Sequence, residues 1–437
     1  MDKTINIGIA GLGTVGCGVI KNLIRNKVIL KKKYNFNFNI SGISASSRNK
    51  KRSINTDQFK WFDDPIDLAK NKDIDLIIEL IGGEKGVALK LAIETIKSKK
   101  GFITANKALI SSNGKILSEL ASKDRTFVGY EAAVAGGIPI IKTLKSGLFL
   151  DEINNIYGIL NGTSNFILSM MNNANKSFNE ALSEAKKLGY AEADPSYDIN
   201  GLDAAHKLSI LSALSYGEFP SLEDIQIKGI ENILTLDHKY ANEFGYKIKL
   251  VGSSILNKGN IIKEVSPTLV GKNSPLGTVE GVSNVICLNT SHNGTLILEG
   301  EGAGEGPTSA SVLSDIIDFS NDIKCHFFNK NFSDLVEPSD NNNILLRCYY
   351  LRVFLVDEKG SMAKLTSILE KNSISIDQVI QRGDLHLKDE KNSTPVIMLT
   401  HPIDSESINS SFSELIKTDL ILLDPIFLPV LKDNFEV

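Results

Sequence analysis

Excess charge of one sign, paired cysteines and long apolar runs are all scarce in this sequence of 437 residues. Its formal net charge of −4 gives no global reason to expect nucleic acid or a membrane surface as a partner. No apolar run approaches the roughly 20 residues of a membrane-spanning helix, and no secretory signal is recognisable. The cysteines are scattered without C-x-x-C spacing, which indicates reduced thiols in a cytoplasmic protein: Cys17, Cys287, Cys325 and Cys348.

The first 140 residues alternate short apolar runs with amphipathic segments. Helices are predicted after the first strand and at 87–100, and strands at 5–10, 38–45, 74–82, 101–110 and within 125–139. The run at 74–82 is apolar almost throughout, as expected for a strand that is covered on both faces. Residues 1–140 are therefore predicted to form a Rossmann-type domain with a parallel, doubly wound sheet.

The remainder of the chain shows two further patterns. Strands without regular intervening helices predict a mixed sheet, so residues 141–328 are expected to form a second domain of α+β type. The polar, turn-rich stretch 329–343 is predicted to be a linker. Residues 344–437 then follow the order strand–helix–strand–strand–helix–strand, which is typical of a ferredoxin-like domain. The chain as a whole is assigned to the α/β class.

A glycine-rich turn joins the first predicted strand to the first helix. Gly11, Gly13 and Gly16 form G-x-G-x-x-G, which allows a tight turn and a close approach of the backbone to a pyrophosphate at the helix N-terminus. A glycine turn alone is weak evidence, but its place after a short strand in a βαβ pattern favours a nucleotide site. A purely structural turn is the alternative.

The end of the second strand bears on which nucleotide is bound. NAD sites place an acidic residue there, whereas a 2′-phosphate is held by basic side chains. Here the sequence reads SASSRNKKR, with no acid until Asp57. We therefore favour NADP(H) over NAD(H), unless the loop is only a solvated basic segment. Its candidate phosphate ligands are Ser46, Ser47, Arg48, Lys50 and Lys51.

Two lysines lie where few lysines would be expected. Lys107 follows the apolar strand GFITA together with Thr104 and Asn106, so it is predicted to face the crevice beyond the sheet rather than bulk solvent. Lys207 and Asp203 stand one turn apart at the start of the otherwise apolar helix 201–217. Burying that pair without a function would be costly. The neighbouring His206 is predicted to be structural.

An acidic segment precedes this helix. Residues 191–201 are predicted to be a loop, because Pro195 interrupts helical continuation. Its carboxylates, Glu192, Asp194 and Asp198, suit a substrate that carries an ammonium group. The alternative is an acidic surface loop that only caps the helix. No His, Cys and Asp residues have zinc-site spacing, and no hydrolase triad is recognisable.

Several segments, in this order, resemble homoserine dehydrogenases: GLGTVG, TANKALI, GYEAAVAGGIPII, LNGTSNFIL and GYAEADPSYDINGLDAAHKLSIL. The likeness spans roughly residues 5–325 and is most specific at 186–212. The tail LRVFLVDEKGSMAKLTSILEKNSISIDQVIQ is similar to an ACT domain, a small ligand-sensing module. This organisation matches the monofunctional form of the enzyme, which acts in threonine, methionine and isoleucine biosynthesis.

The resemblance implies reversible NAD(P)H-dependent reduction of L-aspartate 4-semialdehyde to L-homoserine. It assigns catalysis and dimerisation to the domain 141–328. It assigns acid–base catalysis to Lys207, with Asp203 orienting it, and cofactor and substrate positioning to Lys107. It assigns the substrate amino group to Glu192 and Asp198, and places Gly304 near the nicotinamide or substrate. In the cofactor loop it implies contacts from Gly11, Gly13, Thr14, Val15 and Gly16. The contact expected from Arg48 rests on the charge of the basic loop alone, because that loop is not a fixed feature of the family, and the cofactor preference stays open. Since two nearby ammonium groups disfavour each other's charge, we expect one lysine to titrate closer to neutral pH.

The resemblance also implies a monovalent cation, Na+ or K+, in the turn after the fifth strand. Its ligands would be the carboxylate of Glu131 and the carbonyls of Val134, Gly136 and Ile138, an all-oxygen set that suits a hard cation. A glycine-rich structural turn is the alternative.

Regulation and assembly follow from the same resemblance. Threonine is the effector expected at the DEKGSMAKL turn of the tail, and a tail that only dimerises is the alternative. Assembly as a homodimer or homotetramer is expected, without nucleic-acid or membrane partners. Two other functions stay open at this stage: an oxidoreductase for another amino-acid aldehyde or hydroxy acid, and a non-catalytic NADP(H)-sensing protein.

Overall fold

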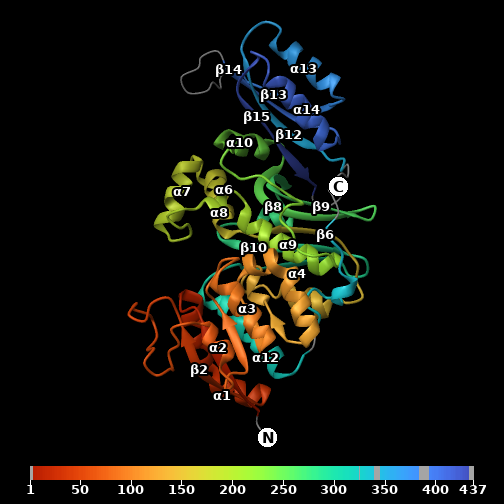
Figure 1. Ribbon diagram of the computed structural model, residues 1–437. Coiled ribbons are helices and arrows are strands. Elements are labelled where there is room, and N and C mark those ends of the chain that lie inside the picture. Colours follow the sequence, from red (N-terminus) through yellow and green to blue (C-terminus); the bar gives the residue numbers. More distant parts are fainter. Residues whose placement is uncertain (1–2, 324, 339–344, 383–392, 433–437) are drawn as a thin grey trace.

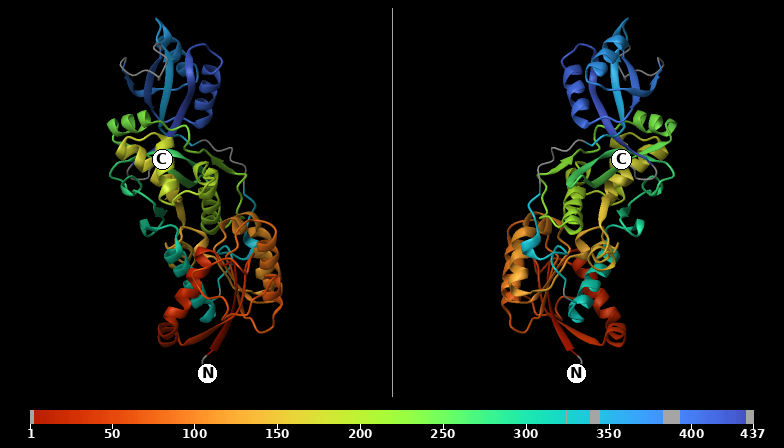
Figure 2. Two further views of the ribbon diagram at one scale, coloured as in Figure 1. Left: turned by 90° about the vertical axis from the view of Figure 1, so that its left-hand side faces the viewer. Right: turned by 90° about the vertical axis from the view of Figure 1, so that its right-hand side faces the viewer.

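The computed structural model describes residues 3–323, 325–338, 345–382 and 393–432. Figures 1 and 2 show an elongated molecule in which the N-terminal sheet and the C-terminal unit occupy opposite ends, with a second sheet between them. No helix in the described ranges is both long and apolar enough to cross a membrane.

The N-terminal sheet has five parallel strands in the order β2-β1-β3-β4-β5, which confirms the predicted Rossmann-like sheet. Its strands are β1 (Lys3–Ala10), β2 (Phe36–Ser44), β3 (Leu76–Glu79), β4 (Gly101–Thr104) and β5 (Val128–Gly129). Its helices are α1 (Thr14–Tyr34), α2 (Ile66–Lys70), α3 (Val87–Lys97) and α4 (Lys107–Asp124). The strand order changes direction between β1 and β3, and ligands of such sheets bind beyond the strand ends at that point.

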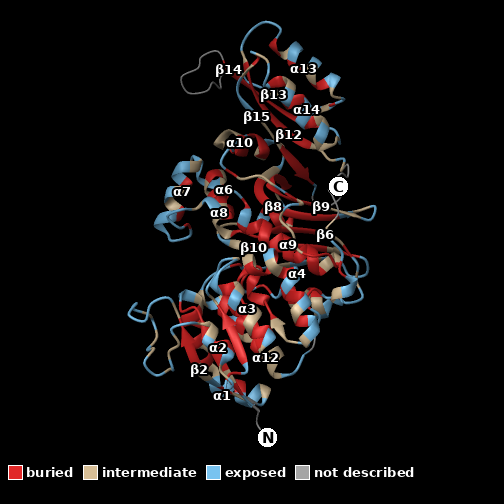
Figure 3. Ribbon diagram, viewed as in Figure 1, coloured by how far each residue is buried: buried red, intermediate tan, exposed pale blue. Residues whose placement is uncertain are grey.

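Both faces of this sheet are buried (Figure 3). Because successive strand residues point to opposite faces, Ile77 and Phe102 enter one apolar core while Ile78 and Ile103 enter the other. This double coverage explains why β3 and β4 are apolar almost without interruption. Glu79 is the exception, and it lies at the end of β3 where the nucleotide crevice begins.

A late segment returns to the N-terminal sheet. Helix α12 (Glu305–Ser320) packs against α1, with Lys21 Nζ 2.8 Å from Glu305 Oε1 and Asn22 Nδ2 2.6 Å from Ser309 Oγ. Gly18 of α1 has no room for a side chain, because an added Cβ would lie 2.5 Å from the Glu305 side chain. The close α1–α12 contact therefore joins the end of the middle region to the nucleotide-binding helix.

The middle sheet is mixed, as predicted. Its main strands run antiparallel in the order β11-β10-β6-β8-β9, and the short β7 pairs in parallel with β9. The strands are β6 (Ile153–Ile159), β7 (Ile225–Ile227), β8 (Tyr246–Asn257), β9 (Asn260–Gly271), β10 (Ser283–Thr290) and β11 (Gly294–Glu301). The helices are α5 (Ile140–Lys142), α6 (Gly162–Ala174), α7 (Phe178–Lys187), α8 (Ser196–Ile199), α9 (Leu202–Tyr216), α10 (Thr235–Glu243) and α11 (Pro275–Thr278).

A strand within 125–139 is present, as predicted, but it is only two residues long, and a single turn of 3-10 helix at Glu131–Ala133 follows it. One other local prediction was wrong. The segment 191–201 is not wholly a loop, because α8 begins directly after Pro195. Proline is tolerated at the start of a helix, where its missing N–H has no intrahelical partner to lose.

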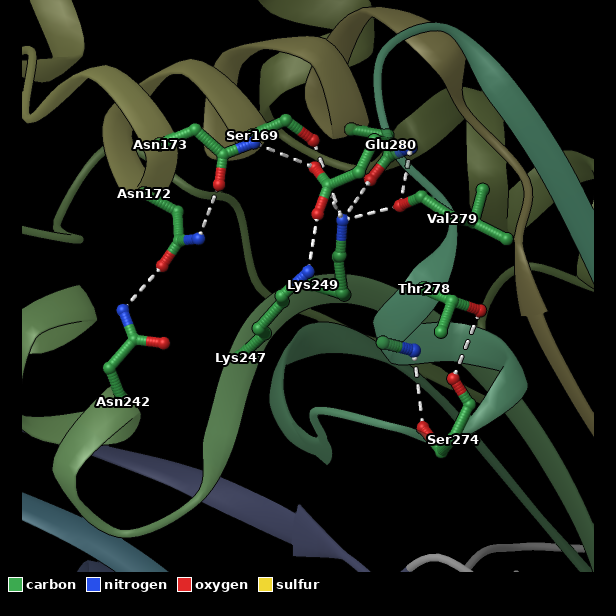
Figure 4. A network of polar contacts seen from close by, with 12 residues as sticks. Ser169, Asn172, Asn173, Asn242, Lys247, Lys249, Ser274, Thr278, Val279 and Glu280 are labelled. Atoms are coloured by element: carbon green, nitrogen blue, oxygen red, sulfur yellow. Dashed lines mark hydrogen bonds and ion pairs between the residues drawn. The ribbon is translucent and has the colours of Figure 1, made fainter.

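A buried lysine fastens α6 to the middle sheet (Figure 4). Lys249 Nζ on β8 donates to the carbonyl of Val279 at 2.6 Å and to Asn165 Oδ1 at 3.0 Å, and it lies 3.5 Å from Glu280. Burial lowers the pKa of Lys249 to about 8, although the Glu280 carboxylate favours its charge. Asn242 Nδ2 of α10 also donates to Asn172 Oδ1 of α6 at 2.7 Å. Helix α6 is thereby held by both β8 and α10, through residues seven positions apart on one face of the helix.

The C-terminal unit has its strands in the antiparallel order β15-β12-β14-β13, with two helices covering one face. Its elements are β12 (Tyr349–Val356), α13 (Ser361–Lys371), β13 (Ile376–Gln381), β14 (Ser393–Thr400), α14 (Ser405–Leu415) and β15 (Ile421–Leu431). The end of β15 pairs in parallel with β9, so this sheet continues into the middle sheet.

The second face of the C-terminal sheet docks on α10. Tyr350 Oη donates to Asp237 Oδ1 at 2.8 Å, and the buried guanidinium of Arg352 pairs with the other oxygen of Asp237. Of the predicted linker, residues 339–343 lie outside the described residues. Its described part crosses the middle region, where Val336 bridges to Glu218.

Candidate active site

The glycine-rich turn has the geometry of a phosphate cradle. Gly11 has a φ of 102°, and an added Cβ would lie 2.3 Å from the carbonyl oxygen of Leu80. At Gly16 an added Cβ would lie 2.0 Å from the Gly11 carbonyl, whereas nothing lies within 4 Å of one at Gly13. Gly11 and Gly16 therefore close the turn, and Gly13 leaves open space at the N-terminus of α1. No side chain caps that terminus, so its first N–H groups are available to a pyrophosphate.

A buried carboxylate, which the sequence prediction missed, organises the neighbouring strand ends. Glu79 Oε1 accepts from the backbone N–H groups of Ile81 and Gly82 at 2.7 and 3.0 Å, and its Oε2 accepts from Thr104 Oγ1 at 2.6 Å. Thr104 Oγ1 in turn accepts from the N–H of Asn106 at 2.9 Å. The only sequence signal for this role is a charged residue at the end of an otherwise apolar strand.

Lys107 is the first residue of α4, and its neighbour fixes where that helix begins. The Asn106 side chain accepts from the N–H of Leu109 at 3.1 Å as an N-cap and donates to the Gly83 carbonyl at 2.7 Å. The ammonium of Lys107 lies 3.0 Å from Asp203 Oδ1 of α9. The Lys107 side chain is 33% exposed, and its ammonium is directed towards this acidic residue of α9.

Asp203 bridges the two lysines. Its Oδ2 accepts from Lys207 Nζ at 2.8 Å and from Asn161 Nδ2 at 2.8 Å, while its Oδ1 faces Lys107. Lys207 Nζ also donates to the Leu160 carbonyl at 2.6 Å. Asp203 and Lys207 are 4% and 8% exposed, so the pair predicted at the start of an apolar helix is indeed buried.

Asp203 and Lys107 each stabilise the charged form of the other. Burial opposes ionisation of Asp203, but the two lysines outweigh it and hold the pKa of the carboxyl well below its usual range. Burial likewise opposes the charge of Lys107, yet Asp203, Asp198 and Glu192 leave its pKa raised. Lys107 is therefore an ammonium at neutral pH. The expectation that repulsion brings a lysine closer to neutral pH does not hold for Lys107, because a carboxylate lies between the two amines.

The acidic segment before α9 faces the same cluster. Asp198 Oδ1 accepts from Asn161 Nδ2 at 2.7 Å, so Asn161 joins it to Asp203. Burial raises the pKa of Asp198, and the Asp203 charge adds to the effect. Glu192 is exposed and near enough to Lys107 to favour its charge. Asp194 instead accepts from the N–H of Ser196 at 3.1 Å at the start of α8, so it has a local structural role.

The basic loop after β2 is shaped by an arginine that was not among the predicted ligands. Arg52 donates to the carbonyls of Ser47 at 2.5 Å and Lys50 at 2.9 Å and thereby curls the loop. The guanidinium carbons of Arg48 and Arg52 lie 5.9 and 5.6 Å from the ring centre of Trp61. Trp61 bridges to Ile43 of β2, so this cationic loop lies next to the strand end where a nucleotide ribose is expected.

The predicted cation turn presents a buried carboxylate. Glu131 is 1% exposed, and its two oxygens accept from the N–H groups of Ile141 and Lys142, each at 2.9 Å. Burial raises the pKa of Glu131 to about 7 despite these bonds. The ammonium of Lys142 lies on Asp318 at 2.6 Å instead. Among the predicted carbonyls, Gly136 accepts from Ser311 Oγ at 2.6 Å and Ile138 accepts from the N–H of Ile140 at 2.8 Å.

Gly304 begins α12 with a φ of 114°. The backbone just before it lies against the cation turn, because a Cβ added at Gly136 would lie 2.5 Å from Gly302. The residue after it, Glu305, contacts Lys21 of the nucleotide-binding helix. The structure thus places Gly304 between the predicted cation turn and α1, and its predicted contact with nicotinamide or substrate stays a prediction.

Comparison with known proteins gives a consistent family. A family model described as homoserine dehydrogenase matches residues 139–317, and its NAD-binding domain model matches residues 11–131. The homoserine dehydrogenase of Neisseria gonorrhoeae is 36% identical over 426 residues, which are 96% of this chain and 97% of that protein. The Helicobacter pylori enzyme is 37% identical, covering 97% of this chain and 98% of that protein.

Solved structures agree with these relatives. The crystal structure of a homoserine dehydrogenase from Thiobacillus denitrificans superposes with a TM-score of 0.90 at 33% identity, covering 98% of each chain. A hyperthermophilic archaeal homoserine dehydrogenase in complex with NADPH has a TM-score of 0.63 at 27% identity, covering 73% of this chain and 98% of that one.

Proposed function

The chain belongs to the homoserine dehydrogenase family, and from that premise we propose how its own residues carry out the family's reaction. That reaction is the reversible reduction of L-aspartate 4-semialdehyde to L-homoserine. The observation that carries the assignment of roles is the buried bridge of Asp203 between Lys107 and Lys207. This bridge joins α4 of the nucleotide-binding region to α9 of the middle region.

Lys207 exchanges the proton at the substrate oxygen. A lysine ammonium has three N–H donors, and here two of them bind the Leu160 carbonyl and Asp203. The third is left for the oxygen that becomes an alkoxide during reduction, and the same nitrogen, when neutral, accepts the hydroxyl proton during oxidation. A nicotinamide cofactor held at the glycine-rich turn would supply the hydride chemistry at the substrate carbon, as acceptor during oxidation and as donor during reduction.

Lys107 stabilises the negative charge that develops on the substrate oxygen. Its raised pKa keeps it positive while Lys207 changes its protonation state. Asp203 holds both amines in place and is too strongly ionised to take part in the proton transfer itself. Lys207 thus transfers the proton, and Lys107 stabilises the charge.

We assign the substrate amino group to Glu192 and Asp198. Replacing Glu192 with glutamine is expected to raise the KM for homoserine about tenfold with little change in kcat, because a carboxylate–ammonium contact contributes equally to the ground and transition states. Initial rates at saturating cofactor measure this. Asp194→Asn is the matched control, since within the described part of the chain Asp194 is hydrogen-bonded to Ser196 at the start of α8. An unchanged KM in the Glu192 variant would remove this residue from the amine site.

We assign preference for NADP(H) to the basic loop, and the archaeal relative solved with NADPH supports this choice. Arg48→Ala is expected to weaken NADPH about tenfold and NADH by less than about twofold, because only the former carries a 2′-phosphate. Binding titrations with both cofactors measure this. Lys123→Ala on the exposed end of α4 is the control. Equal losses for the two cofactors would refute the phosphate assignment.

Two further assignments concern ligands outside the reaction. The all-oxygen turn of Glu131, Val134, Gly136 and Ile138 fits a monovalent cation in its chemistry, because a cation there would compensate a buried carboxylate. Its contribution would be to hold the turn between β5 and α5. The C-terminal unit has the strand order expected of an ACT domain, and we assign threonine to the turn that precedes α13.

One assay of the unaltered protein tests these assignments together. Homoserine oxidation should exceed oxidation of malate and other hydroxy acids, should be faster with NADP+ than with NAD+, and should respond to threonine and to K+ or Na+. Cofactor binding without any turnover would instead identify a sensor. Turnover that is insensitive to threonine would leave the C-terminal unit with a role in assembly alone.

A further inference from the structure

A second side-chain contact joins α4 to α9. The imidazole Nδ1 of His206 is hydrogen-bonded to Ser111 Oγ, and both residues are buried, at 5% and 2% exposure. The two residues are 95 positions apart in the sequence. Ser111 lies on α4, which packs against α3 of the nucleotide-binding region, and His206 lies on α9, which packs against β8 of the middle sheet. The bond therefore crosses the boundary between the nucleotide-binding region and the middle region.

This contact runs alongside the ion pair of the active site. Lys107 and Ser111 are four residues apart on α4, so they lie on one face about 6 Å apart along the helix axis. Their partners on α9, Asp203 and His206, are three residues apart and likewise share a face. One contact between two helices permits rotation about it, whereas two contacts one turn apart define their relative orientation. The Lys107–Asp203 ion pair is thus one polar contact between α4 and α9, and the Ser111–His206 bond is a second one.

Tyr197 contacts a residue of each of these two polar contacts. Its ring stacks on His206 with the centroids 5.6 Å apart and the planes at 25°. The Lys107 ammonium lies 5.7 Å from the centre of the same ring, within the range of a cation–π contact. Tyr197 comes from α8, which begins after Pro195, so the acidic segment also contributes to this interface.

The charge state of His206 matches its position. Burial lowers the pKa of His206, and Lys107 lowers it further, against the opposing influence of Asp203 and Glu84. At neutral pH the ring is therefore uncharged, and its Nδ1 shares one hydrogen bond with the Ser111 hydroxyl. A charged ring would place a second cation near Lys107.

We infer that His206, through Ser111 and Tyr197, is a positioning residue that fixes Lys107 and the nucleotide-binding region relative to Lys207. This inference rests on the proposed function and extends it. The nucleotide cradle and Lys107 are attached to the first sheet, whereas Lys207 is on α9, so the α4–α9 orientation sets the distance from hydride acceptor to proton acceptor. Misplacing reacting groups by even about 1 Å can cost about 100-fold in rate.

Three variants of the full chain test the inference. His206→Leu and Ser111→Ala should each lower kcat about tenfold, with the KM for homoserine and the Kd for NADPH within about twofold of the unaltered protein. His206→Asn, whose side-chain amide can still reach Ser111, should recover most of the lost kcat. The double variant Ser111→Ala with His206→Leu should be no slower than either single variant, because one bond is lost only once.

The controls separate this inference from the proposed function. If the unaltered protein oxidises homoserine and Lys207→Met does not, the function stands, and only the Ser111 and His206 variants decide the inference. A kcat within about twofold of the unaltered value in both would overturn it, as would a His206→Asn variant as slow as His206→Leu. If His206→Leu does not fold, Ser111→Ala and His206→Asn decide alone, because both leave the α4–α9 packing nearly unchanged.

Discussion

Lys207→Met is expected to lower kcat for homoserine oxidation by about 10³-fold or more, while the Kd for NADPH stays unchanged. Removing a general acid–base group costs typically about 10²–10⁴-fold, and methionine keeps the apolar stem of the side chain. Among the described residues, the lost amine is hydrogen-bonded to Leu160 and Asp203, and in the proposed mechanism it also contacts the substrate oxygen. Cofactor binding is assigned to the glycine turn and the basic loop, which belong to the other sheet. Steady-state rates and a fluorescence titration with NADPH measure the two quantities.

Two comparisons make that result specific. Lys123→Met changes an exposed lysine on α4 and should leave kcat unaltered. Lys207→Arg keeps a positive charge but holds its protons at all accessible pH values, so it should be nearly as slow as the methionine variant. A Lys207→Arg variant with substantial oxidation of homoserine would show that a cation, and not a proton acceptor, is needed at this position. A Lys207→Met variant with an ordinary rate would remove Lys207 from the mechanism.

Local sequence patterns predict those features of the fold that depend on residues close together in the sequence. The parallel sheet follows from apolar runs that alternate with amphipathic helices, and both Gly11 and Gly16 are glycines because the backbone of the turn leaves no room for a Cβ. The pairing of Asp203 with Lys207 follows from their spacing of four residues in a helix. In each case the partners are near in sequence, so periodicity and spacing contain the information.

Contacts between distant segments were missed for the same reason. Nothing in the sequence joins Glu79 to Thr104, although one charged residue at the end of an apolar strand is a signal that could have been weighed. The bond between His206 and Ser111 was not predicted, because Ser111 lies on a helix of the other region. Arg52 was overlooked within a run of basic residues, since only the fold of the loop turns its guanidinium towards the carbonyls. The sequence therefore predicts individual residues of the candidate site, but not the hydrogen bonds that join distant segments.

Asp203→Asn is expected to be the second most damaging change, with kcat lowered about 10²–10³-fold and the protein still folded. The amide is isosteric with the carboxylate, so the contact with Lys207 can persist as a neutral hydrogen bond, but the negative charge between the two amines is lost. Lys107 then loses the main partner that keeps its pKa raised, while the burial that lowers this pKa remains. Its pKa should fall, so the ammonium that stabilises the alkoxide is lost at a lower pH than in the unaltered protein.

The sign of this shift distinguishes an electrostatic role for Asp203 from a purely steric one. In the reductive direction the rate should decline with rising pH sooner in Asp203→Asn than in the unaltered protein, because charged Lys107 is needed at the substrate oxygen. Asp198→Asn is the matched control: this carboxylate shares Asn161 with Asp203, but no direct ion pair joins it to either lysine among the described residues. It should raise the KM for the substrate and lower the pH at which the rate declines by less than Asp203→Asn does, because Asp198 contributes less than Asp203 to the raised pKa of Lys107. If Asp203→Asn and Asp198→Asn give the same pH profile and the same kcat, Asp203 does not maintain the charge of Lys107. The proposal that Lys107 stabilises the alkoxide while Lys207 transfers the proton would then be wrong.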